Sequence, residues 1–250
     1  MDEALLRALL PGLPALRLYG RVDSTNALAL AWARGDAPHG AVVIADSQEK
    51  GRGRRGRAFH SPPGGLYLSL IVDTPGLGPG QVTTLAAVAA ALAIGEVLGV
   101  HAGIKWVNDL LYAGRKVGGI LCEGVLLEGR LGRTVIGIGL NTGYGQFPES
   151  LLHIAGPLPD QGVQHARERL AAAIIPGILK GLRAVPAHMG EYRSRCVTLR
   201  QPVAFEQGGR AMQGQALDVD DEGALLVRTE KEDIRLLAGD VSLNKPVPGA

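Results

Sequence analysis

Several features that define other classes of protein are scarce in this 250-residue sequence. It has only two cysteines, Cys122 and Cys196, which lie far apart and outside any CxxC or Cys/His spacing, so neither a disulfide framework nor a zinc site is indicated. The N-terminus from Met1 to Pro11 has no basic segment followed by an unbroken apolar run, as a signal peptide would. The Ala-rich apolar stretch 85–94 is too short to span a bilayer. We therefore expect a cytoplasmic protein without a membrane partner.

A strong charge of either sign is also missing. The 26 Lys and Arg residues against 24 Asp and Glu give a formal net charge of +2. No global field therefore favours nucleic acid or an anionic membrane, and any site for a polyanion must be local. With 46% hydrophobic and 20% charged residues, the chain has the composition of a globular protein, long enough for one large domain with or without a small companion.

Common catalytic and nucleotide-binding motifs are absent as well. The sequence contains no GxxxxGK(S/T) loop, no GxGxxG between a strand and a helix, no GxSxG elbow, and no evident Ser/His/Asp or Cys/His set. If ATP is used, it is not held by either of those nucleotide-binding folds. Catalysis would then depend on positioning and electrostatics.

The hydrophobic pattern predicts helices and strands in turn over the first 192 residues. Helices are expected at 3–10, from the cap Ser24-Thr25-Asn26 to a stop at Gly35, at 83–98, and at 165–182, the last kinked or split by Pro176-Gly177. Strands are expected at 41–45, 66–72, 104–106, 117–127 and 134–140, with turns at 113–115 and 128–129. Together they predict an α+β fold with a mixed or antiparallel sheet flanked by helices.

The pattern changes after Tyr192. Short alternating strands divided by Gly-Gly and Asp-Glu-Gly turns are predicted within 197–205, 211–229 and 234–243. They indicate a small β-barrel or sandwich of about 50 residues, too small to house the main active site and packed against the first domain. We therefore divide the chain into a main domain, 1–192, and a C-terminal domain, 193–250.

The most unusual segment is GRGRRGR at residues 51–57, which has no periodicity and predicts a loop. Arginine offers a rigid fork of donors to carboxylates and phosphates, and glycine lets backbone amides approach an anion. Taken alone, the segment is equally compatible with a small anionic ligand, with RNA, or with a solvated loop without a ligand.

Two further segments carry candidate chemistry. In KWVND at 105–109, the Lys105 ammonium could stabilise a transferring phosphoryl or acyl-phosphate oxygen, while Asp109 could hold a magnesium ion or orient the lysine. Taken alone, a surface ion pair with an Asn-Asp turn is the simpler explanation. In VIGIGLN at 135–141, the glycines of a buried strand permit a flat ligand to approach, although such glycines more often serve packing.

Six segments taken in order resemble the catalytic domain of biotin–protein ligases: Ser24-Thr25-Asn26, Gln48 with GRGRRGR at 51–57, SPPGGLYLS at 61–69, KWVND at 105–109, GRKVGGILCEG at 114–124, and VIGIGLN at 135–141. The ending GALLV…AGDVSL resembles the SH3-like C-terminal domain of that family. The resemblance covers roughly residues 20–245, and six segments in the order of the family are far more specific than any one of them.

The resemblance implies a two-step reaction. The carboxylate of biotin would attack the α-phosphate of ATP to give biotinyl-5'-AMP and pyrophosphate, and a lysine of a biotin carboxyl carrier protein would then take the acyl group. ATP and biotin would be the substrates, with Mg²⁺ as the accompanying ion, and a homodimer is left open. About 20 residues precede Ser24, too few for the helix-turn-helix domain of the repressor-type members, so operator DNA is not expected as a partner.

Carried over position by position, the resemblance also implies the site residues. Lys105 would contact the reacting carboxylate and phosphate oxygens as the main catalytic residue, with Arg54 in a loop that closes over the reactive intermediate. The residues implied to bind biotin are Ser24, Thr25, Asn26, Gln48, Arg52, Gly53, Arg54, Lys105 and Gly119. Those implied to bind ATP or the adenylate are Arg52, Arg54, Arg55, Arg57, Lys105, Asn108 and Asn141. Gly139 would lie along the ligand, and Asp109 is the candidate metal ligand.

The sequence departs from the pattern of the family at two positions. Val107 replaces the usual proline of the KWVND segment, and Phe59 stands where a tryptophan is common. Both keep apolar bulk, so we expect altered loop stiffness and retained function.

Two other functions compete with the ligase prediction. A lipoate ligase or lipoyl/octanoyl transferase typically carries Arg-Arg-x-Ser-Gly-Gly-Gly in place of GRGRRGR, and an RNA-binding module would require more aromatic residues than the 4% present.

Overall fold

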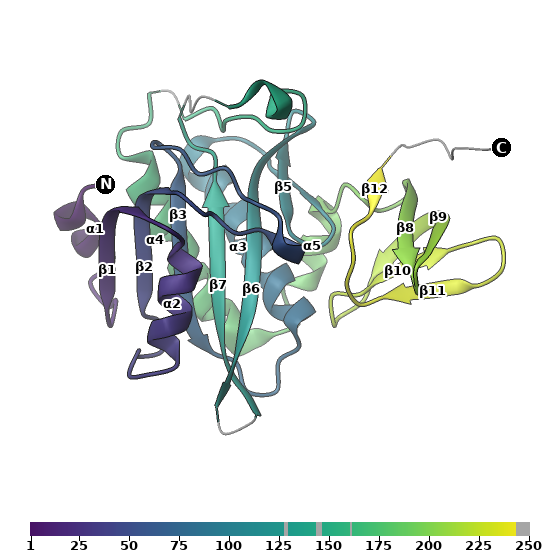
Figure 1. Cartoon of the computed structure of the whole chain (residues 1–250), viewed down its shortest axis with the longest axis horizontal. Coiled ribbons are helices and arrows are strands. Elements are labelled where there is room, and N and C mark those ends of the chain that lie inside the picture. The colour runs from purple at the N-terminus through teal and green to yellow at the C-terminus, as the bar shows by residue number, and fades with distance from the viewer. Residues whose placement is uncertain (128–129, 144–146, 161, 244–250) are drawn as a thin grey trace.

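Two separate sheets form the framework of the protein (Figure 1). The computed structural model describes residues 1–127, 130–143, 147–160 and 162–243. The larger sheet has the order β1-β2-β3-β7-β6-β5-β4, in which β1 and β2 are parallel and all other neighbours antiparallel. Its strands are β1 Leu16–Val22, β2 Val42–Gln48, β3 Leu66–Asp73, β4 Gly103–Lys105, β5 Asp109–Tyr112, β6 Arg115–Leu127 and β7 Arg130–Leu140. The predicted mixed sheet is confirmed, whereas β1 and β5 are not among the predicted strands.

Helices cover both faces of this sheet (Figure 1). The strand β3 shows the division, because successive side chains of a strand point to opposite faces. Leu68 and Leu70 join the core formed with α3 and α4, whereas Ile71 packs with Ala29 and Leu30 of α2 on the other face. The helices are α1 Glu3–Leu9, α2 Thr25–Ala33, α3 Pro79–Leu98, α4 Ala166–Gly181 and α5 Met189–Arg195, with short 3-10 segments at Arg54–Gly56, Glu149–Leu151 and Leu182–Ala184.

The ends of α2 and α3 follow their sequence signals. Ser24 caps α2, since its side chain accepts a hydrogen bond from the backbone nitrogen of Ala27 at 3.4 Å. The helix α3 begins at Pro79, four residues before its predicted start, and stops at Gly99, whose φ is 70°. By length and composition α3 could cross a membrane, but 67% of its most apolar window is buried inside the protein. This is the environment expected of a core helix that is apolar on all sides.

A kink or a split was predicted at Pro176-Gly177, and the split does not occur, because α4 continues from Ala166 to Gly181. Its face with Leu170, Ile174 and Ile178 is fully buried. The helix α3 lies so close that a Cβ added at Gly181 would stand 2.4 Å from Leu85 Cδ1. Burial of this face outweighs the one backbone hydrogen bond that proline cannot donate.

The second sheet is antiparallel, with the order β11-β10-β9-β8-β12. Its strands are β8 Pro202–Gln207, β9 Arg210–Val219, β10 Leu225–Arg228, β11 Asp233–Leu236 and β12 Ser242–Leu243. The two predicted turns are present, with φ of 58° and 76° at Gly208 and Gly209 and of 83° at Gly223. The division at residues 192 and 193 and the SH3-like closure remain predictions, and the turn predicted at 128–129 lies outside the described residues.

Candidate active site

A cavity lies on the α2 face of the larger sheet, under the segment 51–57, which we call the arginine loop. Most residues predicted for the site line this one cavity. They are Ser24, Thr25, Asn26, Gln48, Arg52, Gly53, Arg54, Arg57, Lys105, Asn108, Asp109 and Gly119. Gly139 lines it as well, while Arg55 and Asn141 do not. The structure thus brings together predicted residues that are up to 115 positions apart in the sequence, from Ser24 to Gly139, and their roles in binding remain predictions.

The floor of the cavity is a row of residues in register across five strands. Tyr67 of β3 lies opposite Gly139 of β7, which lies opposite Gly119 of β6. The row continues through Asp109 of β5 to Lys105 of β4. Residues directly opposite one another on neighbouring strands share a face of the sheet. The ammonium of Lys105 and the carboxylate of Asp109 therefore stand at one end of a strip of glycines.

The ring of Phe59 lies on this strip. A Cβ added at Gly139 would stand 2.4 Å from Phe59 Cε1, and one added at Gly119 would stand 3.6 Å from Phe59 Cε2. The same ring meets Tyr67 edge-on, with 6.5 Å between the ring centres. Burial raises the pKa of the Tyr67 phenol, so this hydroxyl stays protonated. Gly139 therefore makes room for the ring of Phe59, whereas a Cβ at Gly119 would make only an ordinary van der Waals contact with it.

Lys105 differs from the other cations of the cavity. Its side chain is half-buried, and its ammonium has no hydrogen bond or ion pair within the described part of the chain. Lys116, which lies nearby, pairs with Asp109 at 2.6 Å between Nζ and Oδ1. Because partial burial weakens solvation without supplying a counter-ion, Lys105 presents an uncompensated positive charge to any ligand in the cavity.

Two arginines attach the arginine loop to the sheet. Arg52 forms an ion pair with Glu123 of β6 at 3.1 Å, and Arg54 donates to Asn108 Oδ1 at 3.0 Å. Asn108 is in turn fixed, because its Nδ2 donates to the carbonyl of Ile120 at 2.9 Å. These two contacts therefore hold the loop over the cavity.

The part of the chain that carries the second sheet, which we call the C-terminal unit (residues 193–243), also contributes to the site. Residues 240–242 line the cavity, and Asp240 accepts a hydrogen bond from Arg57 Nη2 at 2.5 Å. Arg55 lies 3.6 Å from the same carboxylate. Sequence reasoning did not find Asp240, because no local pattern links a residue near the C-terminus to a loop 183 positions earlier.

At the opposite end of the cavity, hydroxyl and amide groups form a connected network. The backbone nitrogen and the hydroxyl of Thr25 both donate to Gln48 Oε1, at 2.8 and 3.1 Å. Gln48 Nε2 donates to Ser61 Oγ at 2.9 Å. A primary amide has two N–H groups, so Gln48 retains one for a ligand.

The amide of Asn26 uses both of its N–H groups in hydrogen bonds within the protein, whereas the amide of Gln48 retains one. Its Nδ2 donates to Glu123 Oε2 at 2.9 Å and to the carbonyl of Leu121 at 3.4 Å, and its Oδ1 accepts from Ser69 Oγ at 2.6 Å. A Cβ at Gly137 would stand 2.1 Å from that oxygen, so the glycine makes room for the amide. Asn26 therefore has one oxygen lone pair left for a ligand. Neither Ser69 nor Glu123 was predicted, although Glu123 lies in the segment 114–124 that carries the resemblance.

The remaining predicted residues lie at the margin. Asn141 is buried, donates to the carbonyls of Lys116 and Gly156, and lines a neighbouring cavity that shares Lys105 and Phe59 with the first. Among the described residues, no group of three or more His, Cys, Asp or Glu side chains could hold a metal ion. The carboxylate of Asp109 is paired with Lys116, and its role as a metal ligand remains a prediction.

Comparisons with known proteins show which family and which fold the chain resembles. Residues 18–141 match the family described as biotin/lipoate A/B protein ligase, and residues 198–244 match the biotin protein ligase C-terminal domain. The chain is 33% identical to a biotin–(acetyl-CoA-carboxylase) ligase of Mycobacterium tuberculosis, covering 96% of this chain and 95% of that protein. It is 35% identical to the bifunctional ligase/repressor BirA of Bacillus subtilis, over 89% and 72%. A solved biotin protein ligase from Aquifex aeolicus, in complex with biotin and ATP, is 25% identical, with a TM-score of 0.81 over 93% of this chain and all of that chain.

Proposed function

The chain belongs to the biotin–protein ligases of the biotin/lipoate A/B protein ligase family, and from that premise we propose that Lys105 stabilises the charge that develops while biotin is activated. The protein activates biotin with ATP and transfers it to a lysine of an acceptor protein. The lipoate-ligase and RNA-binding alternatives are not favoured.

One observation carries the assignment of Lys105. Its ammonium has no partner among the described residues, whereas every other cation that lines the cavity has one. When the carboxylate oxygen of biotin attacks the α-phosphorus of ATP, the bond to pyrophosphate breaks and negative charge gathers on the phosphoryl oxygens. A cation without a partner can meet that charge without first breaking an ion pair or a hydrogen bond, so its full attraction lowers the barrier. The lysine stands at the end of the glycine strip, where the loop and the floor of the cavity meet.

The second step transfers the acyl group. The amine of an acceptor lysine attacks the acyl carbon of biotinyl-5'-AMP, and AMP leaves with the bonding electrons. We assign the acceptor as a biotin carboxyl carrier protein. The mixed anhydride is prone to hydrolysis, so it must be covered until the acceptor arrives, and the arginine loop above the cavity is suited to that task.

Mg²⁺ belongs to the proposal as the ion that accompanies ATP. The floor of the cavity offers it one carboxylate, that of Asp109, and one or two carboxylates are usual where Mg²⁺ is held mainly by phosphates. The same carboxylate contacts Lys116, so binding the ion there requires the lysine to move. A cytoplasmic location, the absence of operator binding, and a homodimer as an open alternative are further parts of this proposal.

Release of pyrophosphate from ATP tests the substrate assignment directly. We expect biotin to stimulate release strongly, and lipoate to stimulate it no more than a reaction without added acid, because the network around Gln48 matches the polar ureido group of biotin. The rate is measured by a coupled phosphate assay with the three acid conditions side by side. A response to lipoate equal to that to biotin would contradict the assignment.

Asp240 leads to a prediction about ATP. Its carboxylate forms ion pairs with Arg55 and Arg57, which are predicted to bind the phosphates of ATP, so Asp240 competes with the nucleotide for these arginines. Asp240→Asn should therefore lower the KM for ATP by about two- to fivefold, the size expected for a partly exposed ion pair, and less at high salt. The measurement is the initial rate against ATP concentration at saturating biotin. An unchanged or raised KM would show that Asp240 supports nucleotide binding instead of opposing it.

A further inference from the structure

Lys105 stands at a weakly supported point of the larger sheet. The strand β4 has only three residues, Gly103–Lys105, lies at the edge of the sheet, and pairs on one side with β5. The chain leaves the sheet directly after Lys105. Short edge strands have few hydrogen bonds to hold them, so a fixed position for the ammonium requires support from elsewhere.

Part of that support comes from residues 196–198, which bond to both neighbours of Lys105. On one side, the backbone nitrogen of Val197 donates to the carbonyl of Ile104 at 2.9 Å. On the other side, the backbone nitrogen of Trp106 donates to Thr198 Oγ1 at 2.9 Å, and Thr198 is completely buried. Both bonds therefore hold the backbone on either side of the lysine.

A third bond lies one residue further along. The hydroxyl of Tyr192, at the end of the main domain, donates to the carbonyl of Val107 at 3.2 Å. Burial raises the pKa of this phenol, which keeps the proton available for the bond.

The indole of Trp106 reaches the second sheet. Its side chain is 3% exposed, and Nε1 donates to the carbonyl of Gly223 at 2.9 Å. Gly223 has a φ of 83°, and a Cβ placed on it would stand 2.8 Å from the carbonyl carbon of Gly80, in the first turn of α3. A Cβ on Gly80 would in turn stand 2.2 Å from the carbonyl oxygen of Glu222. The turn that accepts the indole N–H is therefore pressed against α3 and has little freedom to move.

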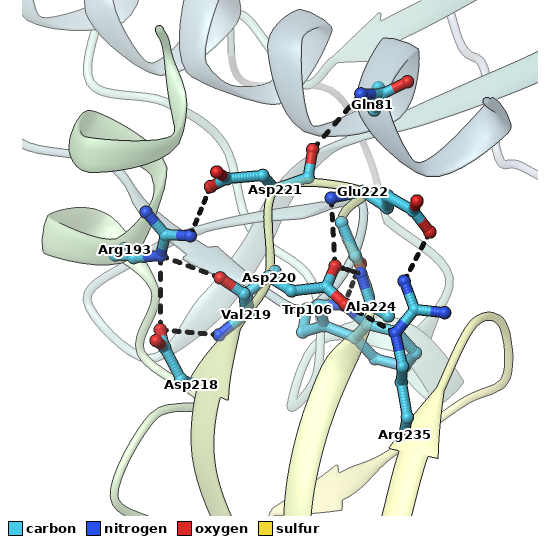
Figure 2. Close-up of polar contacts among 11 residues, drawn as sticks. Gln81, Trp106, Arg193, Asp218, Val219, Asp220, Asp221, Glu222, Ala224 and Arg235 are labelled. Atoms are coloured by element: carbon cyan, nitrogen blue, oxygen red, sulfur yellow. Dashed lines mark hydrogen bonds and ion pairs between the residues drawn. The ribbon is translucent and has the colours of Figure 1, made fainter. Parts of the chain in front are cut away.

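The turn is also braced from within (Figure 2). The carboxylate of Asp220 accepts from the backbone nitrogens of Glu222 and Ala224, at 3.0 and 2.9 Å, and from Arg235 Nε at 2.6 Å. Burial alone would raise the pKa of Asp220, but these donors outweigh it and lower the pKa, so the carboxylate stays ionised. The conformation that presents the Gly223 carbonyl is thus fixed by three donors.

A second set of contacts joins the turn to the helices of the main domain (Figure 2). Arg193 of α5 donates to the carbonyl of Val219 at 2.7 Å and to the carboxylate of Asp221 at 2.6 Å. Gln81 of α3 donates to the carbonyl of Asp221 at 3.3 Å. The turn is therefore held between two helices as well as by its own bonds.

We propose that Trp106 is a positioning residue for Lys105, held by Thr198 and by the turn 219–224 of the C-terminal unit. We call these three elements the Lys105 clamp. The proposal depends on the role assigned to Lys105 above. It gives the small second sheet a part in the first chemical step, because the indole N–H transmits the position of the turn to the residue next to the lysine. Loss of the clamp should leave the hydrogen bonds around Gln48 unchanged, while the ammonium of Lys105 is no longer held in one position.

The first test is Trp106→Phe, which removes the indole N–H and keeps an aromatic ring. A misplacement of about 1 Å can cost about a hundredfold in rate, so we expect the kcat of biotin-dependent pyrophosphate release to fall by about ten- to a hundredfold. The KM for biotin should stay within about twofold. Rates are expressed per active site, titrated by the burst of biotinyl-5'-AMP. The matched control is Trp32→Phe, which changes the other tryptophan of the chain, on α2, and should leave both constants unchanged.

The second test uses a pair of substitutions at Thr198. Thr198→Val removes the hydroxyl that accepts from Trp106 and keeps the shape of the side chain, whereas Thr198→Ser keeps the hydroxyl. We expect kcat per active site to fall about tenfold or more for valine and to stay within about twofold for serine. Equal rates for the two variants would overturn the proposal. So would a loss explained entirely by fewer active sites per chain, because it would mean that the residues matter for folding alone.

Lys105→Ala, assayed in parallel, distinguishes failure of the clamp proposal from failure of the role assigned to Lys105. Loss of activity in Lys105→Ala with unchanged kcat in Trp106→Phe would overturn the clamp and leave the role of Lys105 standing. Activity retained in Lys105→Ala would overturn both.

Discussion

Replacing Lys105 with alanine should lower biotin-dependent formation of biotinyl-5'-AMP by about a thousandfold, equivalent to about 4 kcal/mol of transition-state stabilisation. The ammonium is the one cation lining the cavity that lacks a partner among the described residues, so no neighbouring charge is already in place to substitute for it. The nearest alternative, Lys116, is held by Asp109 at 2.6 Å. The measurement is a single-turnover assay of adenylate formation at saturating biotin and ATP.

The same substitution should leave the stability of the protein nearly unchanged. Because the Lys105 ammonium has no hydrogen bond or ion pair with any residue that the structure describes, alanine removes no such interaction. We expect the thermal unfolding midpoint of Lys105→Ala to match that of the parent. Lys180→Ala is a suitable control, because this lysine is exposed in the last turn of α4 on the other side of the sheet. Pyrophosphate release by Lys105→Ala at the parental rate would remove the residue from the mechanism.

Some of the elements predicted from the sequence have long runs of buried residues. The helix α3 is buried without interruption from Val82 to Ala91, and seven of the eight residues of the strand β3 are buried, so both give a clear apolar signal. The strand β1, Leu16–Val22, lies at the edge of the sheet and has no fully buried residue. Apolar and polar side chains do alternate along it, but Gly20 interrupts the alternation and the strand was not predicted. The helix α5 has seven residues and includes Gly190, too short and too weak a helix former to give a periodic signal.

The site shows a similar division between local and distant information. The arginine loop is recognisable from its unusual composition, whereas Lys105 and Gln48 were assigned through the ordered set of segments that resembles the ligase family. Asp240 is not recognisable, since its partner Arg57 lies 183 residues away and nothing near either residue specifies the other. The occupied amide of Asn26 is equally hidden, because the sequence does not reveal that Glu123 and Leu121 take both of its N–H groups.

The α4 helix shows how tertiary packing overrides a strong local signal. Pro176 cannot donate the backbone bond that a helix interior requires, and the dipeptide with Gly177 is typical of a break. The buried face around Ile174 and Ile178 nevertheless packs continuously against α3 and the sheet. The rule that Pro-Gly breaks a helix did not predict the continuous α4. The free energy gained by burying this face is larger than the cost of the missing backbone hydrogen bond, and the sequence shows that gain less directly.

Arg54→Gly should produce an enzyme that still forms biotinyl-5'-AMP but releases it before transfer. Arg54 holds the arginine loop to the main sheet through a hydrogen bond to Asn108 at 3.0 Å, and Asn108 is itself anchored on β6. Glycine removes that bond and adds backbone freedom to a loop that already contains three glycines. A bond to a charged donor contributes about 1.5–3 kcal/mol, so opening of the loop should become about ten- to a hundredfold more frequent.

Two measurements distinguish an opened cover from a damaged active site in Arg54→Gly. The lifetime of enzyme-bound adenylate after rapid removal of free biotin and ATP should fall by about tenfold or more, while the rate of adenylate formation falls far less than in Lys105→Ala. Released adenylate should also label lysines of an unrelated bystander protein. Arg34→Gly is the matched control, because this exposed arginine at the C-terminal end of α2 lies outside the cavity and in a position where glycine is tolerated. If the bond from Arg54 to Asn108 keeps the loop closed, its loss must shorten the lifetime of the bound adenylate. An adenylate lifetime equal in Arg54→Gly and Arg34→Gly would therefore mean that Arg54 does not keep the loop closed.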